Sequence, residues 1–153
     1  MNRRGFTLVE LLATLAVLGL LASIALPKYQ YLRKKAVAVD VMAAMVAVRT
    51  AAFNYNGTTG QWPATAGLGV TPSGLGPYLP GGLSFRTANY RLRWRQVRVG
   101  RGRSRSTYQV LLARFTDGQL CQGVAGLWGG SGNAAIVPVC TARGGTVTLF
   151  IDN

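Results

Sequence analysis

Residues 3–12 read Arg3-Arg4-Gly5-Phe6-Thr7-Leu8-Val9-Glu10-Leu11-Leu12, and this stretch decides the fold because it starts an apolar run that ends only at residue 26. Within residues 6–26 the single charged residue is Glu10. At 1.5 Å per residue, a helix over this run is about 31 Å long, close to the roughly 30 Å of a bilayer core. The run therefore predicts a helix that is surrounded by lipid or by copies of itself.

A basic start followed by an apolar run has three interpretations. A removable secretory signal needs an apolar core of only about 7–15 residues and a small-residue cleavage site, whereas this run is longer and leads into Pro27. A simple membrane anchor leaves Glu10 unexplained, because an ionised side chain inside a bilayer costs about 2.5–3.5 kcal/mol. The third interpretation rests on a family resemblance.

The stretch resembles the prepilin leader of type IV pilins and type II secretion pseudopilins. The likeness is carried by a short basic leader that ends in Gly5, by Phe6 directly after it, and by Glu10 four residues later. Pro27 and Tyr29 also lie where this family places a proline and an aromatic residue. Beyond Tyr29 the chain resembles the family only in its layout.

The resemblance implies a processing and assembly pathway. A prepilin peptidase would cut between Gly5 and Phe6 and methylate the new amine of Phe6. The Glu10 carboxylate would neutralise that amine in a neighbouring subunit, because an unpaired buried charge costs several kcal/mol. The implied partners are copies of this chain, related pilin subunits, the prepilin peptidase and the inner-membrane assembly platform.

The resemblance also implies a location. The chain would cross the bacterial inner membrane once, with its globular part periplasmic or extracellular, and would then enter a cell-surface filament or a periplasmic pseudopilus. Basic residues within 28–35 outnumber Arg3 and Arg4, so the positive-inside rule alone predicts the opposite orientation. We give the leader motif more weight than this count of charges.

Periodicity and composition divide the chain into five segments. Apolar residues recur every three or four positions over 36–55, which predicts an amphipathic continuation of the first helix as far as Asn54, with Asn56 and Gly57 as stop signals. Glycine and proline then crowd the chain and predict a loop that packs onto the domain. The expected segments are a leader (1–5), a transmembrane or assembly helix (6–27), an amphipathic helix (28–56), a Gly/Pro-rich loop (57–85) and a β region (86–153).

The β region begins with an alternation of large apolar residues and arginines around Trp94, which predicts a strand whose apolar residues face the core. The alternation slips at Gln96 and predicts a bulge or a strong twist near this residue. Further strands are expected at 108–115, near 134–140 and at 146–151. The predicted fold is α+β: a long N-terminal helix, membrane-spanning in its first half, packed on a C-terminal antiparallel sheet of about four strands, as in pilins.

The two cysteines, Cys121 and Cys140, are an even pair. Once the domain is exported they lie in an oxidising compartment, where such a pair is expected to form a disulfide. Many type IV pilins hold the C-terminal part of the sheet with a bond of this kind. Two separate buried thiols are the alternative.

Eight arginines lie within residues 86–105. Guanidinium groups bind phosphate in a bidentate manner, so the cluster is a candidate surface for nucleic acid or for an anionic cell surface. The simpler interpretation is a solvated face or a contact between subunits, which we favour. The candidate residues are Arg91, Arg93 and Arg95 on one strand face and Arg101, Arg103 and Arg105 on the following turn.

Composition excludes several classes of protein. Hydrophobic residues make up 49% of the 153 residues, too many for a disordered basic tail, although 17 Lys and Arg against 4 Asp and Glu give a net charge of +13. A polytopic membrane protein is excluded because only one apolar run is long enough to span a bilayer. With no histidine, two cysteines and four scattered carboxylates, the chain offers neither a catalytic set nor metal ligands.

These observations predict a structural subunit of a type IV pilus or type II secretion pseudopilus that is not an enzyme and needs no cofactor. The alternative is a minor tip subunit that binds DNA or an anionic surface through the arginine-rich hairpin. The two functions differ in the abundance of the subunit in purified filaments.

Overall fold

The computed structural model describes residues 7–100, 106–128 and 136–151. The chain divides into two compact units, Met1–Lys34 and Lys35–Asn153. Helix α1 contributes to both units, and all other elements belong to the second. In chain order the elements are α1 (Leu8–Thr59), the short 3-10 helix η1 (Gly76–Tyr78), β1 (Tyr90–Val99), β2 (Ser106–Phe115), α2 (Gly118–Trp128), β3 (Ile136–Thr141) and β4 (Gly144–Ile151).

Helix α1 begins at Leu8 because Thr7 caps it. The hydroxyl oxygen of Thr7 accepts a hydrogen bond from the backbone N–H of Glu10 at 3.3 Å. A threonine followed three residues later by a glutamate is the capping-box pattern, which satisfies N–H groups that have no partner within the helix. Pro27 lies inside α1, where it removes one backbone hydrogen bond, yet the helix continues on both sides of it.

The end of α1 differs from the sequence-based expectation, which stopped the helix at Asn54. The helix continues to Thr59, and Gly60 then takes a left-handed conformation with φ of 69°. The N–H of Gly60 still donates to the carbonyl oxygen of Asn56 at 2.8 Å. Gly60 is therefore the residue that ends the helix, because glycine adopts positive φ without a steric penalty.

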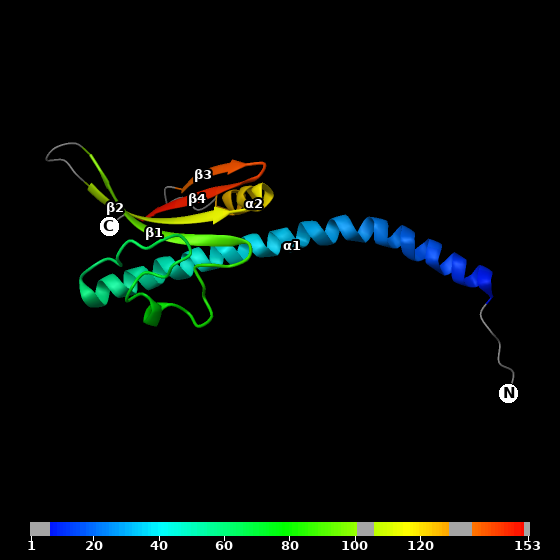
Figure 1. Ribbon diagram of the computed structural model, residues 1–153, viewed down its shortest axis with the longest axis horizontal. Helices are drawn as coiled ribbons and strands as arrows, with labels where there is room; N and C mark the ends of the chain where they lie inside the picture. Colours follow the sequence, from blue (N-terminus) through cyan, green and yellow to red (C-terminus); the bar gives the residue numbers. More distant parts are fainter. Residues whose placement is uncertain (1–6, 101–105, 129–135, 152–153) are drawn as a thin grey trace, which may run out of the picture. The chain divides into compact units, whose positions relative to one another are not determined.

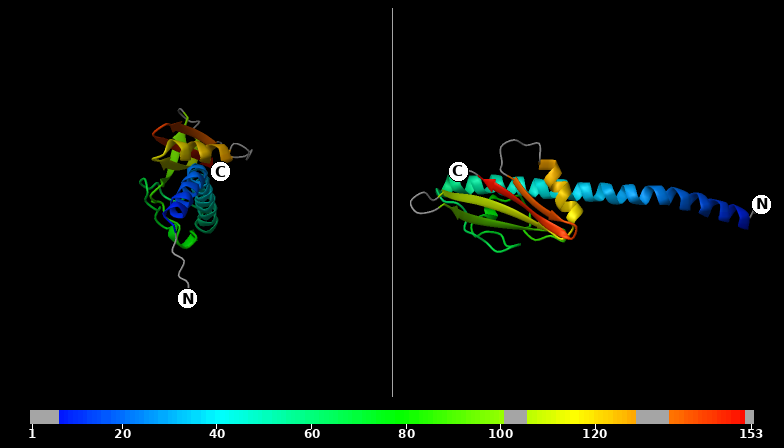
Figure 2. Two further views of the ribbon diagram at one scale, coloured as in Figure 1. Left: turned by 90° about the vertical axis from the view of Figure 1, so that its right-hand side faces the viewer. Right: turned by 90° about the horizontal axis from the view of Figure 1, so that it is seen from above.

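The four strands form one antiparallel sheet in the order β1-β2-β4-β3 (Figure 1). The second half of α1 and the short helix α2 lie on the same face of this sheet (Figures 1 and 2). This arrangement confirms the predicted α+β fold, a long N-terminal apolar helix packed on a four-stranded sheet, as in pilins.

The core lies between these helices and the sheet. Residues of α1 that face it recur at helical spacing, and strand residues that face it recur at every second position, as the sequence patterns predicted. Fully buried side chains of the core include Val41, Met45 and Val48 of α1, Leu92 and Trp94 of β1, Leu111 of β2, Val124 of α2, and Val147 and Leu149 of β4.

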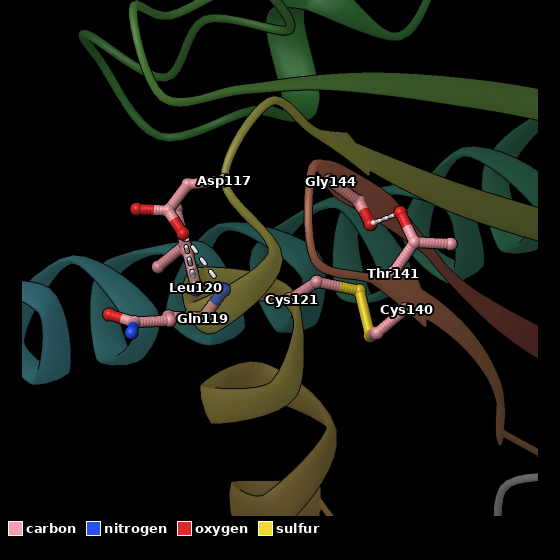
Figure 3. The surroundings of a disulfide bond; sticks show 7 residues. All are labelled: Asp117, Gln119, Leu120, Cys121, Cys140, Thr141 and Gly144. Carbon is pink, nitrogen blue, oxygen red and sulfur yellow. Dashed lines mark hydrogen bonds between the residues drawn. A yellow bond between two sulfur atoms is a disulfide. The ribbon is translucent and has the colours of Figure 1, made fainter.

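Helix α2 was not expected, because its three glycines lower its helix propensity. A cap at its first turn and burial of one face stabilise α2 despite this low propensity. Asp117 caps the first turn through its carboxylate, which accepts the backbone N–H of Gln119 at 2.8 Å (Figure 3). Leu120 and Cys121, which precede Val124 by four and three residues on one face, are buried in the core together with it. Those caps and spacings were present in the sequence and could have revealed the helix.

Of the bulge or strong twist predicted near Gln96, the bulge is wrong. Pairing between β1 and β2 runs without interruption from Tyr90 opposite Phe115 to Val99 opposite Ser106. Val99 is 52% exposed, so this end of the hairpin has no face that is buried in the core. The sequence there is therefore free to depart from the alternation of apolar and polar residues. The alternation of apolar and polar residues is enforced only where one face of a strand is buried.

The loop between α1 and β1 covers the outer edge of the sheet. The backbone N–H of Gly69 donates to the carbonyl oxygen of Leu92 at 2.7 Å, and the N–H of Leu92 donates to the carbonyl oxygen of Phe85 at 2.8 Å. The N–H of Gln96 donates to the hydroxyl oxygen of Thr65 at 3.0 Å. These bonds satisfy backbone groups that an edge strand otherwise leaves open to pairing with another chain.

Candidate functional site

The first half of α1 is apolar around its whole circumference. Its large side chains are exposed, among them Leu8, Leu12, Leu18, Leu21, Ile24 and Leu26. Within the part of the chain that the structure describes, α1 is the one helix long and apolar enough to cross a membrane. A helix that is apolar all round is stable only when lipid or other protein surrounds it.

Glu10 is exposed in the first turn of this helix. A carboxylate at that position is favoured by the helix dipole and by the free N–H groups of the first turn. The sequence-based prediction pairs Glu10 with the amine of Phe6 in another subunit. Gly5 and Phe6, the predicted cleavage and methylation residues, lie outside the described residues.

The Thr7 cap is a structural detail next to Glu10 that the sequence-based reasoning missed. The Thr7 hydroxyl accepts the backbone N–H of Glu10 in the first turn of α1. The signal was available in the sequence, since a threonine precedes the glutamate by three residues.

Cys121 of α2 and Cys140 of β3 form the predicted disulfide, with their Cα atoms 5.7 Å apart (Figure 3). The bond joins the short helix to the edge strand of the sheet. In the adjacent β3–β4 turn, the Thr141 hydroxyl donates to the carbonyl oxygen of Gly144 at 2.8 Å (Figure 3). The disulfide therefore holds the C-terminal strands to the helix layer.

The arginines of β1 are divided between two environments. Leu92 and Trp94 are fully buried, so the arginines that alternate with them lie on the outer face of the sheet, opposite the core. Arg91 and Arg95 are exposed, whereas Arg93 is half-buried and its Nε atom is buried with no hydrogen-bond partner among the described residues. Arg101, Arg103 and Arg105 of the predicted set lie outside the described residues.

A separate recess of about 430 Å³ lies between α1 and the end of the loop, where Asp40 and Tyr90 line it together. Burial raises the pKa of Tyr90 above its usual value of about 10, and the nearby carboxylate of Asp40 raises it further. In the described residues, no three His, Cys, Asp or Glu side chains gather closely enough to hold a metal ion.

One comparison with known proteins concerns the start of the chain. Residues 1–26 match the family described as "Prokaryotic N-terminal methylation motif". The segment that contains Gly5, Phe6 and Glu10 carries a prokaryotic N-terminal methylation motif. This motif and the exposed apolar half of α1 fall on the same stretch of chain.

Curated proteins with similar sequences include type IV major pilins, fimbrial proteins and a prepilin peptidase-dependent protein. The type IV major pilin protein PilE1 of Neisseria gonorrhoeae is 33% identical over 76 residues, which cover 48% of this chain and 46% of that protein. The fimbrial protein EcpC of Eikenella corrodens is 35% identical over 75 residues, covering 47% and 49%. The prepilin peptidase-dependent protein D of Escherichia coli (strain K12) is 39% identical over 50 residues, covering 33% and 34%.

The chain thus spans about half the length, or less, of the curated relatives that it matches. No solved structure matches it significantly. The predicted resemblance to type IV pilins is confirmed by the methylation motif and by these relatives.

Proposed function

We propose that this protein is a structural subunit of a type IV pilus or of a type II secretion pseudopilus. One observation carries the proposal: a helix with exposed apolar residues on every side bears one carboxylate, Glu10, at its start, within a methylation motif. Such a helix needs an apolar surrounding both before and after assembly. A bilayer provides the first, and a bundle of the same helices from other subunits provides the second.

Processing prepares the helix for its transfer from the bilayer to the bundle of helices in the filament. A prepilin peptidase cuts after Gly5 and methylates the amine of Phe6, so the mature chain starts on the apolar run. The relative from Escherichia coli, named as dependent on prepilin peptidase, supports this step. In the filament, Glu10 of one subunit neutralises the Phe6 amine of a neighbour, which sets the axial register because an unpaired buried charge is costly.

The partners in this pathway are copies of the chain, related pilin subunits, the prepilin peptidase and an inner-membrane assembly platform. Before assembly, the subunit resides in the inner membrane, which it crosses once, with its second unit on the periplasmic side. The Cys121–Cys140 disulfide supports this side of the membrane, because disulfides persist in the periplasm and are reduced in the cytoplasm. The role is structural and requires no catalysis.

Mass spectrometry of the mature protein tests the proposal. Intact protein recovered from membranes and from sheared filaments should begin at methylated Phe6. Replacing Gly5 with a bulky residue should leave the leader attached and stop incorporation into filaments, while Gly19→Ala, far from the cleavage site, should be processed normally. Assembled protein that still begins at Met1 would contradict the proposal.

The second candidate function is that of a minor tip subunit that binds DNA through the arginine-rich hairpin. The exposure of Arg91 and Arg95 on the outer sheet face supports it. The half-burial of Arg93 weighs against a continuous row of three guanidinium groups. The salt dependence of DNA binding, described in the Discussion, separates the two candidates.

A further inference from the structure

The outer face of the sheet contains a depression of about 520 Å³ that neither candidate function uses. Three arginines from three different parts of the sheet line it: Arg93 of β1, Arg114 of β2 and Arg143 of the β3–β4 turn. They come together because β2 lies between β1 and β4. Arg114 is opposite Thr146 of β4, and Arg93 is opposite Leu112 of β2, the outer-face neighbour of Arg114.

The rest of the lining is mixed in chemistry. Leu68 of the loop and Val139 of β3 supply apolar walls, while Thr141 and Thr146 supply hydroxyl groups. A second recess of about 270 Å³ shares Leu68 and Arg114 with the first and adds Arg91 and Thr116. The two recesses therefore meet at Arg114.

The charge of this depression is uncompensated within the described residues. No Asp or Glu lines either recess, and no ion pair to Arg93, Arg114 or Arg143 occurs in the described part of the chain. The Nε–H of Arg93 is buried without a hydrogen-bond partner there. An unsatisfied buried donor is costly, and a guanidinium group forms its strongest hydrogen bonds with an oxyanion.

We infer that this depression binds a compact oxyanion ligand, with a carboxylate or phosphate group carried on a body the size of a sugar. The guanidinium groups provide the bidentate geometry that both anions share. The threonine hydroxyls match sugar hydroxyls, and the apolar walls match the faces of a sugar ring. The volume falls within the range of about 300–1,000 Å³ that is usual for small-molecule sites.

This site differs from the arginine stripe proposed for DNA. A duplex carries one charge per about 1.7 Å of its axis and is bound by an extended row of cations, whereas the depression gathers its cations around one open recess. Arg95 provides the matched control. It follows Arg93 on the same face of β1 and is exposed, but it lines neither recess.

The test uses the full chain in a non-ionic detergent. Glucuronate, glucose 6-phosphate and inorganic phosphate are titrated by calorimetry and by NMR at physiological salt, with glucose as the neutral probe. We expect saturable binding of one ligand per chain. Arg93→Gln and Arg143→Gln should each weaken it about tenfold or more, the usual consequence of losing a charge-assisted hydrogen bond, whereas Arg95→Gln should change it by less than about twofold.

Arg143 keeps the test independent of folding, because it is exposed in a turn and its replacement leaves the core unchanged. Binding of glucuronate alone would identify a carboxylate ligand, and binding of both phosphates would identify a phosphate ligand; each supports the site. An absence of saturable binding would overturn it. Equal losses in Arg93→Gln and Arg95→Gln would also overturn it, because they would indicate a diffuse basic surface.

Discussion

The indole N–H of Trp94 donates a buried hydrogen bond to the carbonyl oxygen of Pro63 at 3.0 Å, across 31 residues of sequence. The Nε2 group of Gln96 reaches the same oxygen at 3.3 Å. Trp62, next to Pro63, stacks on Trp94 with ring centroids 6.3 Å apart. Two side chains of β1, Trp94 and Gln96, thus hold the start of the Gly/Pro-rich loop against the sheet.

Replacing Trp94 with phenylalanine should therefore loosen this loop. The variant loses the indole hydrogen bond and part of a fully buried ring, which together should lower the free energy of unfolding by about 1–3 kcal/mol. Denaturant unfolding of the detergent-solubilised chain measures the change. Tyr78→Phe, which removes an exposed hydrogen bond to Thr58, is the control and should cost less than about 0.5 kcal/mol. An equal effect of both variants would contradict the anchoring role of Trp94.

The Glu10→Val variant should be processed and stable in the membrane yet poorly incorporated into filaments, because the Phe6 amine of a neighbouring subunit then has no carboxylate partner. The measurement is the ratio of this variant in sheared filaments to that in membranes. Glu10→Gln keeps the shape and much of the capping capacity but removes the charge, so it should fail similarly.

Thr14→Val is the matched control for Glu10. It removes another polar group from the same apolar helix. The Thr14 hydroxyl donates a hydrogen bond to the carbonyl oxygen of Leu11 within that helix. We expect it to assemble normally. Normal assembly of Glu10→Gln would mean that the charge of this residue is not what sets the register.

Reduction of the Cys121–Cys140 bond should destabilise the C-terminal strands. Opening a disulfide between residues 19 apart in the sequence should lower stability by about 3 kcal/mol, mainly because the unfolded chain gains freedom. Peptide mapping without reductant should recover the two cysteines linked, and the Cys121→Ser/Cys140→Ser double variant should unfold at lower denaturant concentration. Free thiols in protein recovered from the periplasm would contradict the bond.

The arginine-rich hairpin gives the prediction that separates the two candidate functions. A DNA-binding stripe releases counterions, so its affinity for duplex DNA should fall by orders of magnitude between about 50 and 200 mM salt and should disappear in a variant with glutamine at five arginines of the hairpin. Under the structural-subunit proposal, we expect no detectable binding at physiological salt. The variant replaces Arg91, Arg95, Arg101, Arg103 and Arg105 with glutamine.

Binding at low salt alone does not support the DNA candidate, because any chain with a net charge of +13 attracts polyanions. Retained binding at physiological salt that the glutamine variant abolishes would favour the tip-subunit function. The circular dichroism of the variant should match that of the parent, since Arg91 and Arg95 are exposed.

The candidate sites were predictable to different degrees. Glu10 stands out because a single acid in an apolar run is costly wherever it lies, and the cysteine pair stands out because only one disulfide can form. The depression lined by Arg93, Arg114 and Arg143 could not be predicted. Its residues are far apart in the chain and meet only through the pairing of strands.

The sequence by itself determined α1 and the strands, because hydrophobic periodicity is a local property that sets which face of each element is buried. Tertiary structure decided the strand order β1-β2-β4-β3, the continuous pairing past Gln96 and the half-burial of Arg93. Each of these features depends on contacts between residues that are distant in the sequence. The free energy of such contacts outweighs local propensity where a strand face is buried in the core. At Val99, which is exposed, there are no such contacts to enforce the alternation.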